Sequence, residues 1–522
     1  MTMVVPSPFL CFWEKHPALL LGIILLLGTA FSFHCDPIEL FTFFVLLIPF
    51  AKQPRQWKKM GFFLLVFALG WGSASYRAPL IQLNHPKMEG NARFTISSIK
   101  NYQSPFHRSL AYKGKLHGFH SQDKDLFTPI PCQIYLPFST NRPKANCDYE
   151  INGTLVQKGP RQFVFKPKKN RPWTPIPSTS SLAEIRYKAK LAVHDYLKEH
   201  IKDRSASTFL NALATGDVDE RTLSMEFSRL GIQHILAISG FHFALIALFL
   251  SILFNLFLSP RISSSLLILL LSAYYLFLGD SPSVQRAWIA MSAFLVGKLF
   301  NLRISALNAL GLGLCFEVLI EPAVISHLGF ILSFLCTLSI LLLYPLMQPI
   351  CKLLLPSRTF STAKSMPHLD QWGYVIAAFI RNALAVNIAV HLACLPVLLF
   401  LFHRFPLLSL VYNLFFPFWV GISLLLLCAA ALFAFPIPPL GQFLFAINEH
   451  WTSFALTITS HPPALIDFVI RSKSLTYGSV VLFLSALFMA AIFFTESKEP
   501  LPIARWRFML KKLWKHARNS ST

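Results

Sequence analysis

Residues 232–258 read IQHILAISGFHFALIALFLSILFNLFL, an apolar run that contains no Asp, Glu, Lys or Arg. A helix needs about 20 such residues to cross the hydrocarbon core of a bilayer, so this run is long enough to span a membrane. The whole chain has the same character, because 54% of its 522 residues are hydrophobic and 50 of them are Phe. A soluble domain cannot bury that much apolar surface. The sequence therefore predicts a polytopic α-helical membrane protein.

Apolar segments on both sides of this run bring the expected number of spans to about twelve. Residues 264–279 are short and residues 438–460 are only weakly apolar, so either segment could be re-entrant or interfacial. No clean cleavage site follows the first segment, and we expect it to be a retained span rather than a signal peptide. The other expected spans are 17–33, 37–50, 60–76, 283–300, 304–320, 324–348, 375–402, 407–434 and 475–495.

The basic residues between these segments indicate their orientation, because Lys and Arg gather in cytoplasmic loops. The loop AKQPRQWKKM at 51–60 carries four of them and is expected to be cytoplasmic. Alternating the spans from that loop places both termini in the cytoplasm and the long polar stretch after residue 76 outside. The same alternation places inside the basic tail 498–522 and Arg261, Lys298, Arg303, Lys352, Arg358 and Lys364.

The polar stretch 77–204 is strongly basic, with 22 Lys/Arg against 9 Asp/Glu. Short segments with alternating apolar and polar residues, separated by Pro, Gly, Asn and Asp, predict five strands within it. Five short strands suit an extracytoplasmic small β-barrel of the OB type, a fold that often binds oligonucleotides. The alternative is a β-rich spacer with no ligand. The expected strands are 93–100, 109–119, 130–136, 148–157 and 162–166.

The Pro-rich RPWTPIP at 171–177 ends the β module, and a helix is expected over 182–200. Its apolar residues share one face while Lys188 and Lys190 lie elsewhere, which is typical of a helix along a membrane surface. The expected domains are transmembrane helices in 1–76, the OB-like module in 77–177, an interfacial helical linker in 178–231, a transmembrane channel domain in 232–497 and the cytoplasmic tail in 498–522.

Two groups of side chains in the β module leave alternatives open. Cys132 and Cys147 could form a disulfide if the module is extracytoplasmic, or remain free thiols. The aromatic residues Tyr102, Phe106, Tyr112, Phe119 and Trp173 could stack on bases or fill the barrel core. The nine cysteines show no C-x-x-C pair and no His/Cys cluster at metal-ligand spacing, so no metal site or cofactor is expected.

The stretch FLNALATGDVDERTLSMEFSRLGIQHILAISGFHFALI at 209–246 resembles the most characteristic segment of the ComEC family of competence proteins. Three further blocks follow in the same order as in the family: YYLFLGDSPSVQRAWIAM at 274–291, EPAVISHLGFILSF at 321–334 and LPVLLFLFHRFPLLSLVYNLFFP at 395–417. The resemblance marks candidates along a DNA path, namely Gly216, Asp217, His234, Ser239, Gly240, His242, Ser283, Arg286, Gly329, Ser333 and Asn413.

The resemblance implies an inner-membrane channel that translocates single-stranded DNA into the cytoplasm during natural transformation, and not an enzyme. It implies a periplasmic DNA receptor and a cytoplasmic helicase-like ATPase as partners beside membrane lipid, and it leaves open a homo-oligomer. The chain has no G-x-x-x-x-G-K-[ST] loop, so a partner or the proton gradient is expected to supply the energy. Many members carry a C-terminal metallo-β-lactamase-like domain. This sequence contains no His-x-His-x-Asp-His run, so a nuclease step is expected elsewhere.

The polar residues of these blocks could serve more than one role. Ser239 and His242 are three apart, and they could hydrogen-bond between packed helices, line a pore or belong to a hydrolase, although no nucleophile elbow is present. Arg286 follows Ser281 and Pro282 by about one helical turn, and it could contact a phosphate or form an ion pair with Asp280, Glu317 or Glu321. At the level of the whole chain, the alternative is a small-molecule or lipid transporter on the same membrane fold. An internal repeat would favour that alternative, and none is found.

Overall fold

The computed structural model forms two compact units, and the chain passes from one to the other several times. One, here called the barrel unit, comprises residues 74–300 and 418–462, and the other, the helical unit, comprises 1–73, 301–417 and 463–522. The residues that the structure describes are 8–51, 57–77, 85–103, 108–121, 125–138, 142–159, 162–168, 171–177, 179–218, 220–279, 281–463, 467–472 and 474–497.

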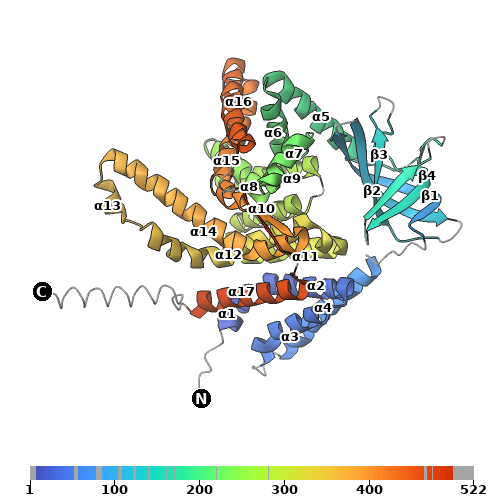
Figure 1. The fold of residues 1–522 in the computed structure, drawn as a ribbon, viewed down its shortest axis with the longest axis horizontal. Helices are drawn as coiled ribbons and strands as arrows, with labels where there is room; N and C mark the ends of the chain where they lie inside the picture. Colours follow the sequence, from blue (N-terminus) through green and yellow to red (C-terminus); the bar gives the residue numbers. More distant parts are fainter. Residues whose placement is uncertain are drawn as a thin grey trace. The chain divides into compact units, whose positions relative to one another are not determined.

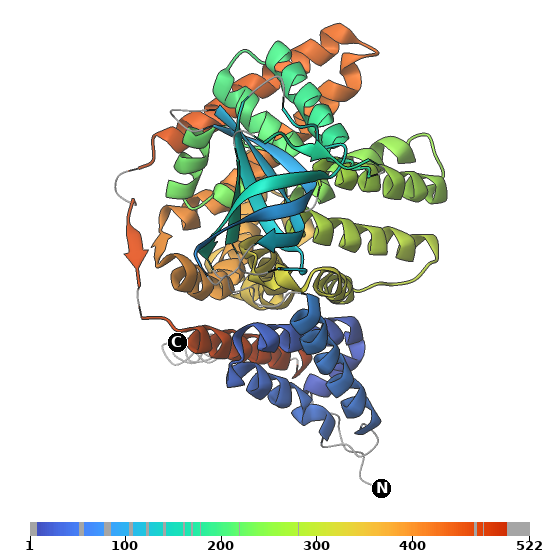
Figure 2. The ribbon, with the colours of Figure 1, turned by 90° about the vertical axis from the view of Figure 1, so that its right-hand side faces the viewer.

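The barrel unit begins with a closed barrel of five strands, which Figures 1 and 2 show from two sides. The strand order is β1-β2-β3-β5-β4, and β4 pairs again with β1 to close the barrel; β3 and β5 are parallel and the other pairs antiparallel. The two-residue β6, Thr174–Pro175, adds to β4. The predicted barrel is confirmed, and its strands are β1 Lys87–Gln103, β2 Arg108–Ser121, β3 Ile130–Pro137, β4 Tyr149–Gly159 and β5 Gln162–Pro167.

Strand β1 closes the barrel because it is long and bent. It pairs with β2 along most of its length and with β4 along its first half, with register shifts at Asn91/Arg93 and Ile96/Ser98. Such bulges increase the local twist that closure requires. At Gly114 of β2, a Cβ would lie 2.1 Å from the carbonyl oxygen of Thr95, so only glycine allows the two strands to pass this closely.

The barrel core is aromatic, and this decides the alternatives that the sequence left open. Tyr112 and Phe119 are completely buried, and the Trp173 ring packs edge-on against those of Phe94, Tyr112 and Tyr149. Of the two alternatives, filling the core therefore holds for Tyr112 and Phe119, and the partly buried Trp173 packs against the same core. The side chain of Tyr102 and the whole of Phe106 lie outside the described residues.

The two cysteines of the module are free thiols, so the disulfide is not formed. Cys132 is buried on β3 among the core side chains. Cys147 lies in the turn before β4, where its thiol contacts the hydroxyl of Tyr149.

The helices of the barrel unit follow the barrel in the chain. They are α5 Ala183–His200, α6 Arg204–Thr215, α7 Arg221–Arg229, α8 Gly240–Asn255, α9 Pro260–Leu278, α10 Pro282–Leu299 and α16 Pro438–Ser460, with the second part of α15 Leu408–Ala434. The weak apolarity of α16 has a structural reason. Asn448 donates to the carbonyl of Ser423 on α15 and accepts from Thr452, so a buried polar network joins the two helices.

The helical unit is built from α1 Pro8–Lys15, α2 Pro17–His34, α3 Pro37–Ala51, most of α4 Trp57–Arg77, α11 Ala306–Ile320, α12 Leu328–Leu354, α13 Phe360–Lys364, α14 His368–Phe402, the first part of α15 and α17 Tyr477–Ser497. A short ladder joins β7 Arg404–Pro406 to β8 Val469–Arg471. Helices α2 and α11 touch through backbone, because a Cβ on Gly311 would lie 2.2 Å from the nitrogen of Leu19. Small residues permit such close approach in membrane helices.

The helices support a multi-pass membrane protein. All twelve predicted spans are wholly or largely helical in the described part of the chain, and seven helices are long and apolar enough to cross a membrane. Two shorter helices, α3 and α11, are also apolar. Twelve spans therefore remain a prediction. Residues 52–56 of the basic loop and the tail 498–522 lie outside the described residues.

Candidate functional site

Helix α8 begins later than its apolar run suggests. Residues 233–235 form a 3-10 turn, and the helix starts at Gly240 with Ser239 as its N-cap in extended conformation. The Nδ1 atom of His242 accepts a hydrogen bond from the backbone N–H of Ser239 at 3.2 Å, and the Ser239 side chain caps the backbone of His242 in return. This capping box explains the Ser-x-x-His spacing, which the sequence suggested as two residues on one helical face.

The imidazole of His242 is buried, and its Nε2 atom has no hydrogen-bond partner in the structure. Because Nδ1 accepts a backbone hydrogen bond, the neutral ring carries its proton on Nε2. The ring therefore has one hydrogen-bond donor to spare beside the first turn of α8.

Arg286 of α10 reaches the same helix end. A Cβ on Gly240 would lie 3.2 Å from Nη2 of Arg286, so glycine leaves the space that the guanidinium occupies. Arg286 is buried, and the N-terminus of a helix is the positive end of its dipole. The structure thus brings together Ser239, Gly240, His242 and Arg286 from two separate sequence blocks, in surroundings that favour a negatively charged group.

The Gly-Asp turn lies at the end of α6. Gly216 takes a left-handed conformation, with φ of 72°, and its N–H closes the helix on the carbonyl of Ala212. The next residue, Asp217, lies between two cations: its carboxylate is 2.9 Å from Nζ of Lys100 on β1 and 3.0 Å from Nζ of Lys190 on α5. Burial alone raises the pKa of Asp217, but the two cations outweigh burial and hold the pKa below its ordinary value.

The ion pair to Lys190 corrects one expectation from the sequence. Lys190 was expected to lie away from the packed face of an interfacial helix, whereas its side chain is largely buried against Asp217. The apolar residues Leu182 and Ile185 are the exposed ones, at 58% and 66%. A helical pattern alone could not reveal this pairing, since Asp217 is 27 residues away in the chain.

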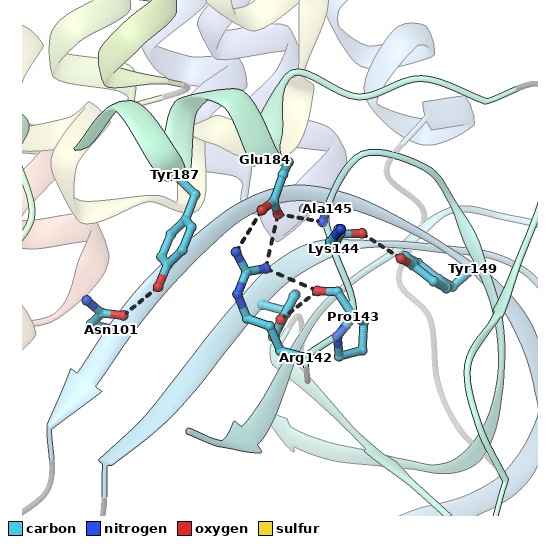
Figure 3. Close-up of polar contacts among 9 residues, drawn as sticks. Asn101, Arg142, Pro143, Lys144, Ala145, Tyr149, Glu184 and Tyr187 are labelled. Atoms are coloured by element: carbon cyan, nitrogen blue, oxygen red, sulfur yellow. Dashed lines mark hydrogen bonds and ion pairs between the residues drawn. The ribbon is translucent and has the colours of Figure 1, made fainter. Parts of the chain in front are cut away.

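Helix α5 is clamped to the barrel by a second carboxylate, shown in Figure 3. Both oxygens of Glu184 accept from the guanidinium of Arg142, at 2.8 and 3.0 Å, and one also accepts from the backbone N–H of Ala145 at 2.8 Å. The guanidinium lies 4.5 Å from the centre of the Tyr187 ring, and the Tyr187 hydroxyl donates to Asn101. The start of α5 and the barrel are therefore held together by buried contacts.

Arg186 extends the same joint to the membrane helices of the barrel unit. Its guanidinium donates to the carbonyl of Ser97 on β1 and to that of Leu276 in the last turn of α9. Gly279, with φ of 88°, is needed beside it, because a Cβ there would lie 2.9 Å from Nη1 of Arg186. A cation at a helix C-terminus is favourable, so this contact connects the barrel to the end of α9.

The outer face of β1, β2 and β3 combines basic and aromatic side chains. Lys113 of β2 is paired in register with Ser98 of β1 and Gln133 of β3, and Tyr135 is the next outward residue of β3. Tyr135 is 41% exposed and donates its hydroxyl to Gln133. Tyr135 was not among the aromatic residues that the sequence singled out. Its place in the alternation of β3, opposite to the buried Ile134, was the available signal.

The remaining candidates lie elsewhere. His234 is exposed in the 3-10 turn before α8, and Ser283 is the second residue of α10. Gly329 and Ser333 near the start of α12, and Asn413 on α15, belong to the helical unit. Asn413 donates to the Ser409 hydroxyl, which also contacts His391, and Asn387 donates to the carbonyl of Leu410. Asn387 lies outside the sequence blocks quoted above, whereas Ser409 lies within the block 395–417 but was not singled out there.

Comparison with known proteins places this arrangement in a family. Residues 214–497, more than half of the chain, match the family described as Competence protein. The chain belongs to this family. The ComEC resemblance noted in the sequence is thereby confirmed, and the match begins just before the Gly216-Asp217 turn.

One curated relative of this chain is ComE operon protein 3 of Bacillus subtilis (strain 168). The two sequences are 29% identical over 215 residues, which are 40% of this chain and 24% of the relative. The chain thus aligns with about a quarter of the length of that relative. No solved structure gives a significant match.

Proposed function

We propose that this chain is an inner-membrane channel that passes single-stranded DNA into the cytoplasm during natural transformation. The match of residues 214–497 to the Competence family carries the proposal. The relative aligns over only part of its own length, so its role is brought to this chain as part of the proposal. In the proposed topology the twelve spans leave both termini in the cytoplasm and the barrel outside, as the basic loops indicate.

The barrel is proposed to capture the strand as an OB-like module. Its closed five-stranded order supports this identity, and OB-folds bind oligonucleotides on the face of strands 2 and 3. On that face, Lys113 and Lys115 of β2 alternate with buried residues, and Tyr135 is exposed on β3. Lysines contact phosphates and an exposed ring stacks on a base, so the face has the residue types that single strands require.

The start of α8 is proposed to contact the strand inside the membrane. A guanidinium, an unused imidazole donor and a helix N-terminus all favour phosphate oxygens over neutral groups. In this proposal His234, Ser283, Gly329, Ser333 and Asn413 line other parts of the route. A periplasmic receptor and a cytoplasmic helicase-like ATPase are the proposed partners at its two ends.

The first test is an uptake assay in a strain from which this chain is deleted. Labelled DNA is followed separately into the periplasm and the cytoplasm, and we expect it to stop in the periplasm. Normal arrival of label in the cytoplasm would contradict the proposal. Arrest of a small-molecule or lipid substrate with normal DNA uptake would favour the transporter alternative.

The second test replaces Arg286. Arg286→Ala is expected to lower cytoplasmic uptake about tenfold or more, because a charge-assisted hydrogen bond to phosphate is lost. Arg286→Lys keeps the charge but not the forked geometry, and it should recover only part of the lost uptake. Arg261→Ala is the matched control, since Arg261 is an exposed arginine at the start of the neighbouring α9. Equal uptake by wild type and a normally inserted Arg286→Ala would leave Arg286 with a packing role.

A further inference from the structure

Asp217 stands in a cluster in which cations outnumber the carboxylate. Lys100 and Lys190 contact its two oxygens, at 2.9 and 3.0 Å. Lys113 is a third ammonium group near them: its pKa is lowered first by burial and then by the charge of Lys100, and Asp217 acts on it in the opposite direction. Arg186 adds a fourth positive charge close enough to lower the pKa of Lys190, after burial and Lys100.

The cluster is continuous with the basic and aromatic face of the barrel. Lys113 belongs to both, since it lies on β2 between Ser98 of β1 and Gln133 of β3. Lys100 lies two residues beyond Ser98, and its side chain is 43% exposed. A strand lying across the face would therefore reach ammonium groups that already hold one anionic group.

Asp217 and its two partners come from three separate parts of the barrel unit. Lys100 comes from the barrel, Lys190 from α5, and Asp217 itself from the turn between α6 and α7 that leads toward α8. Lysine ammonium groups are compact, carry three rotatable donors and sit on flexible stems. They can exchange one anionic oxygen for another without rearranging the backbone.

We propose that the Asp217 carboxylate occupies a phosphate site when no strand is bound, and that a phosphodiester of single-stranded DNA displaces it from Lys100 and Lys190. The inference rests on the proposed function and deepens it. The site is the point where the strand leaves the barrel, and the exchange releases the Gly216-Asp217 turn from the barrel as the strand arrives. The continuity with Lys113 and Tyr135 favours a nucleic-acid strand over a lipid headgroup as the source of the phosphate.

The test is binding of a fluorescent oligothymidine to the purified full-length chain in zwitterionic nanodiscs. Asp217→Asn removes the internal anion, and the strand should then bind about three- to tenfold more tightly. The slope of log affinity against log salt should become steeper by about 0.7, the value for one more uncompensated positive charge facing a single strand. Lys100→Gln should change affinity and slope in the opposite direction.

Glu89→Gln is the matched control for the change in net charge. Glu89 lies on the same strand as Lys100, but its exposed carboxylate pairs with a single cation, Lys168, at 2.6 Å. We expect its effect to be much smaller than that of Asp217→Asn. Folding is checked by thermal melting, and a folded Asp217→Asn protein should gain more melting temperature from the oligonucleotide than wild type does.

The outcomes separate this inference from the proposed function. If wild type binds the strand but folded Asp217→Asn binds it equally or more weakly, Asp217 is a structural ion pair and the inference is wrong. The inference also fails if Asp217→Asn gains affinity only for vesicles of anionic lipid, because the site then serves a headgroup. Normal DNA arrival in the cytoplasm of the deletion strain would overturn the proposed function itself.

Discussion

Two carboxylates form ion pairs at α5, the helix that follows the barrel in the chain, and they are neutralised in different ways. Glu184 of α5 faces one cation, Arg142, and one backbone N–H, that of Ala145. Asp217 faces two ammonium groups directly and has a third nearby. Lys188 also acts on Glu184, at longer range, so the difference lies in the direct contacts: one cation for Glu184 and two for Asp217.

The two carboxylates also differ in the geometry of the cations that bind them. The planar guanidinium of Arg142 binds Glu184 with two parallel hydrogen bonds and lies against the Tyr187 ring, so its position is fixed (Figure 3). The lysines around Asp217 each offer a single point of charge. We infer that a bidentate pair with one arginine serves to hold α5 on the barrel, and that two separate lysine contacts serve to exchange anions.

The largest effect is expected from breaking the ion pair between Arg142 and Glu184. Arg142→Ala leaves the buried Glu184 carboxylate without its cation, and removing one partner of a buried pair costs about 3–5 kcal/mol. The measurement is the unfolding midpoint of the full-length protein in detergent. Lys168→Ala, which breaks the exposed pair with Glu89, is the control and should cost less than about 1 kcal/mol. Equal losses for the two variants would contradict the structural role of Glu184.

A double variant tests whether Arg142 and Glu184 stabilise the protein as one pair. Glu184→Leu combined with Arg142→Leu removes both charges, so no unpaired ion is left in the joint. It should lose less stability than the sum of the two single changes, since neighbouring residues in one ion pair are not additive. Additive losses would mean that the two side chains act independently.

The Glu184 pair should also make the stability of the protein depend on pH, with a smaller effect whose sign can be stated. Burial alone raises the pKa of Glu184, yet the hydrogen bonds from Arg142 and Ala145 outweigh it and hold the pKa below the ordinary 4.5. A carboxyl whose pKa is lowered by folding adds stability above its unfolded pKa and loses it as the pH falls through the folded pKa. Melting temperature should therefore drop in acid, and this part of the drop should be absent in Glu184→Gln.

The barrel could be predicted from sequence because its signals are local. The strands alternate apolar and polar residues between turn residues, and β2 to β5 were placed within about two residues of their ends, whereas the long β1 was predicted only over its middle, 93–100. The family resemblance also marked Gly216, Ser239 and Gly240, and the structure gives their local roles at a left-handed helix end and at a helix cap. The neighbours of these residues in space could not be predicted from the sequence. One example is the Arg286 guanidinium, which packs on Gly240 from another helix.

The failures were of two physical kinds. Tyr112 and Phe119 were candidates for base stacking although the barrel buries them, because composition does not tell inward from outward positions unless the register is followed. Lys190 and Glu184 were not recognised as buried, because a charged residue enters a protein interior only with a partner distant in sequence. Asp217 and Arg142 are those partners, and only the folded chain brings them to α5.

The smallest expected effect comes from two substitutions of Tyr187, one that removes only the hydroxyl and one that removes the ring as well. The hydroxyl donates to Asn101 at a long 3.4 Å, whereas the ring lies 4.5 Å from the guanidinium carbon of Arg142. Tyr187→Phe keeps the ring and should change the free energy of unfolding by less than about 0.5 kcal/mol. Tyr187→Leu removes the cation–π contact and should cost about 0.5–1 kcal/mol more than Tyr187→Phe. Equal values for the two variants would show that the ring does not help to fix Arg142, and that the Glu184 pair alone holds the joint.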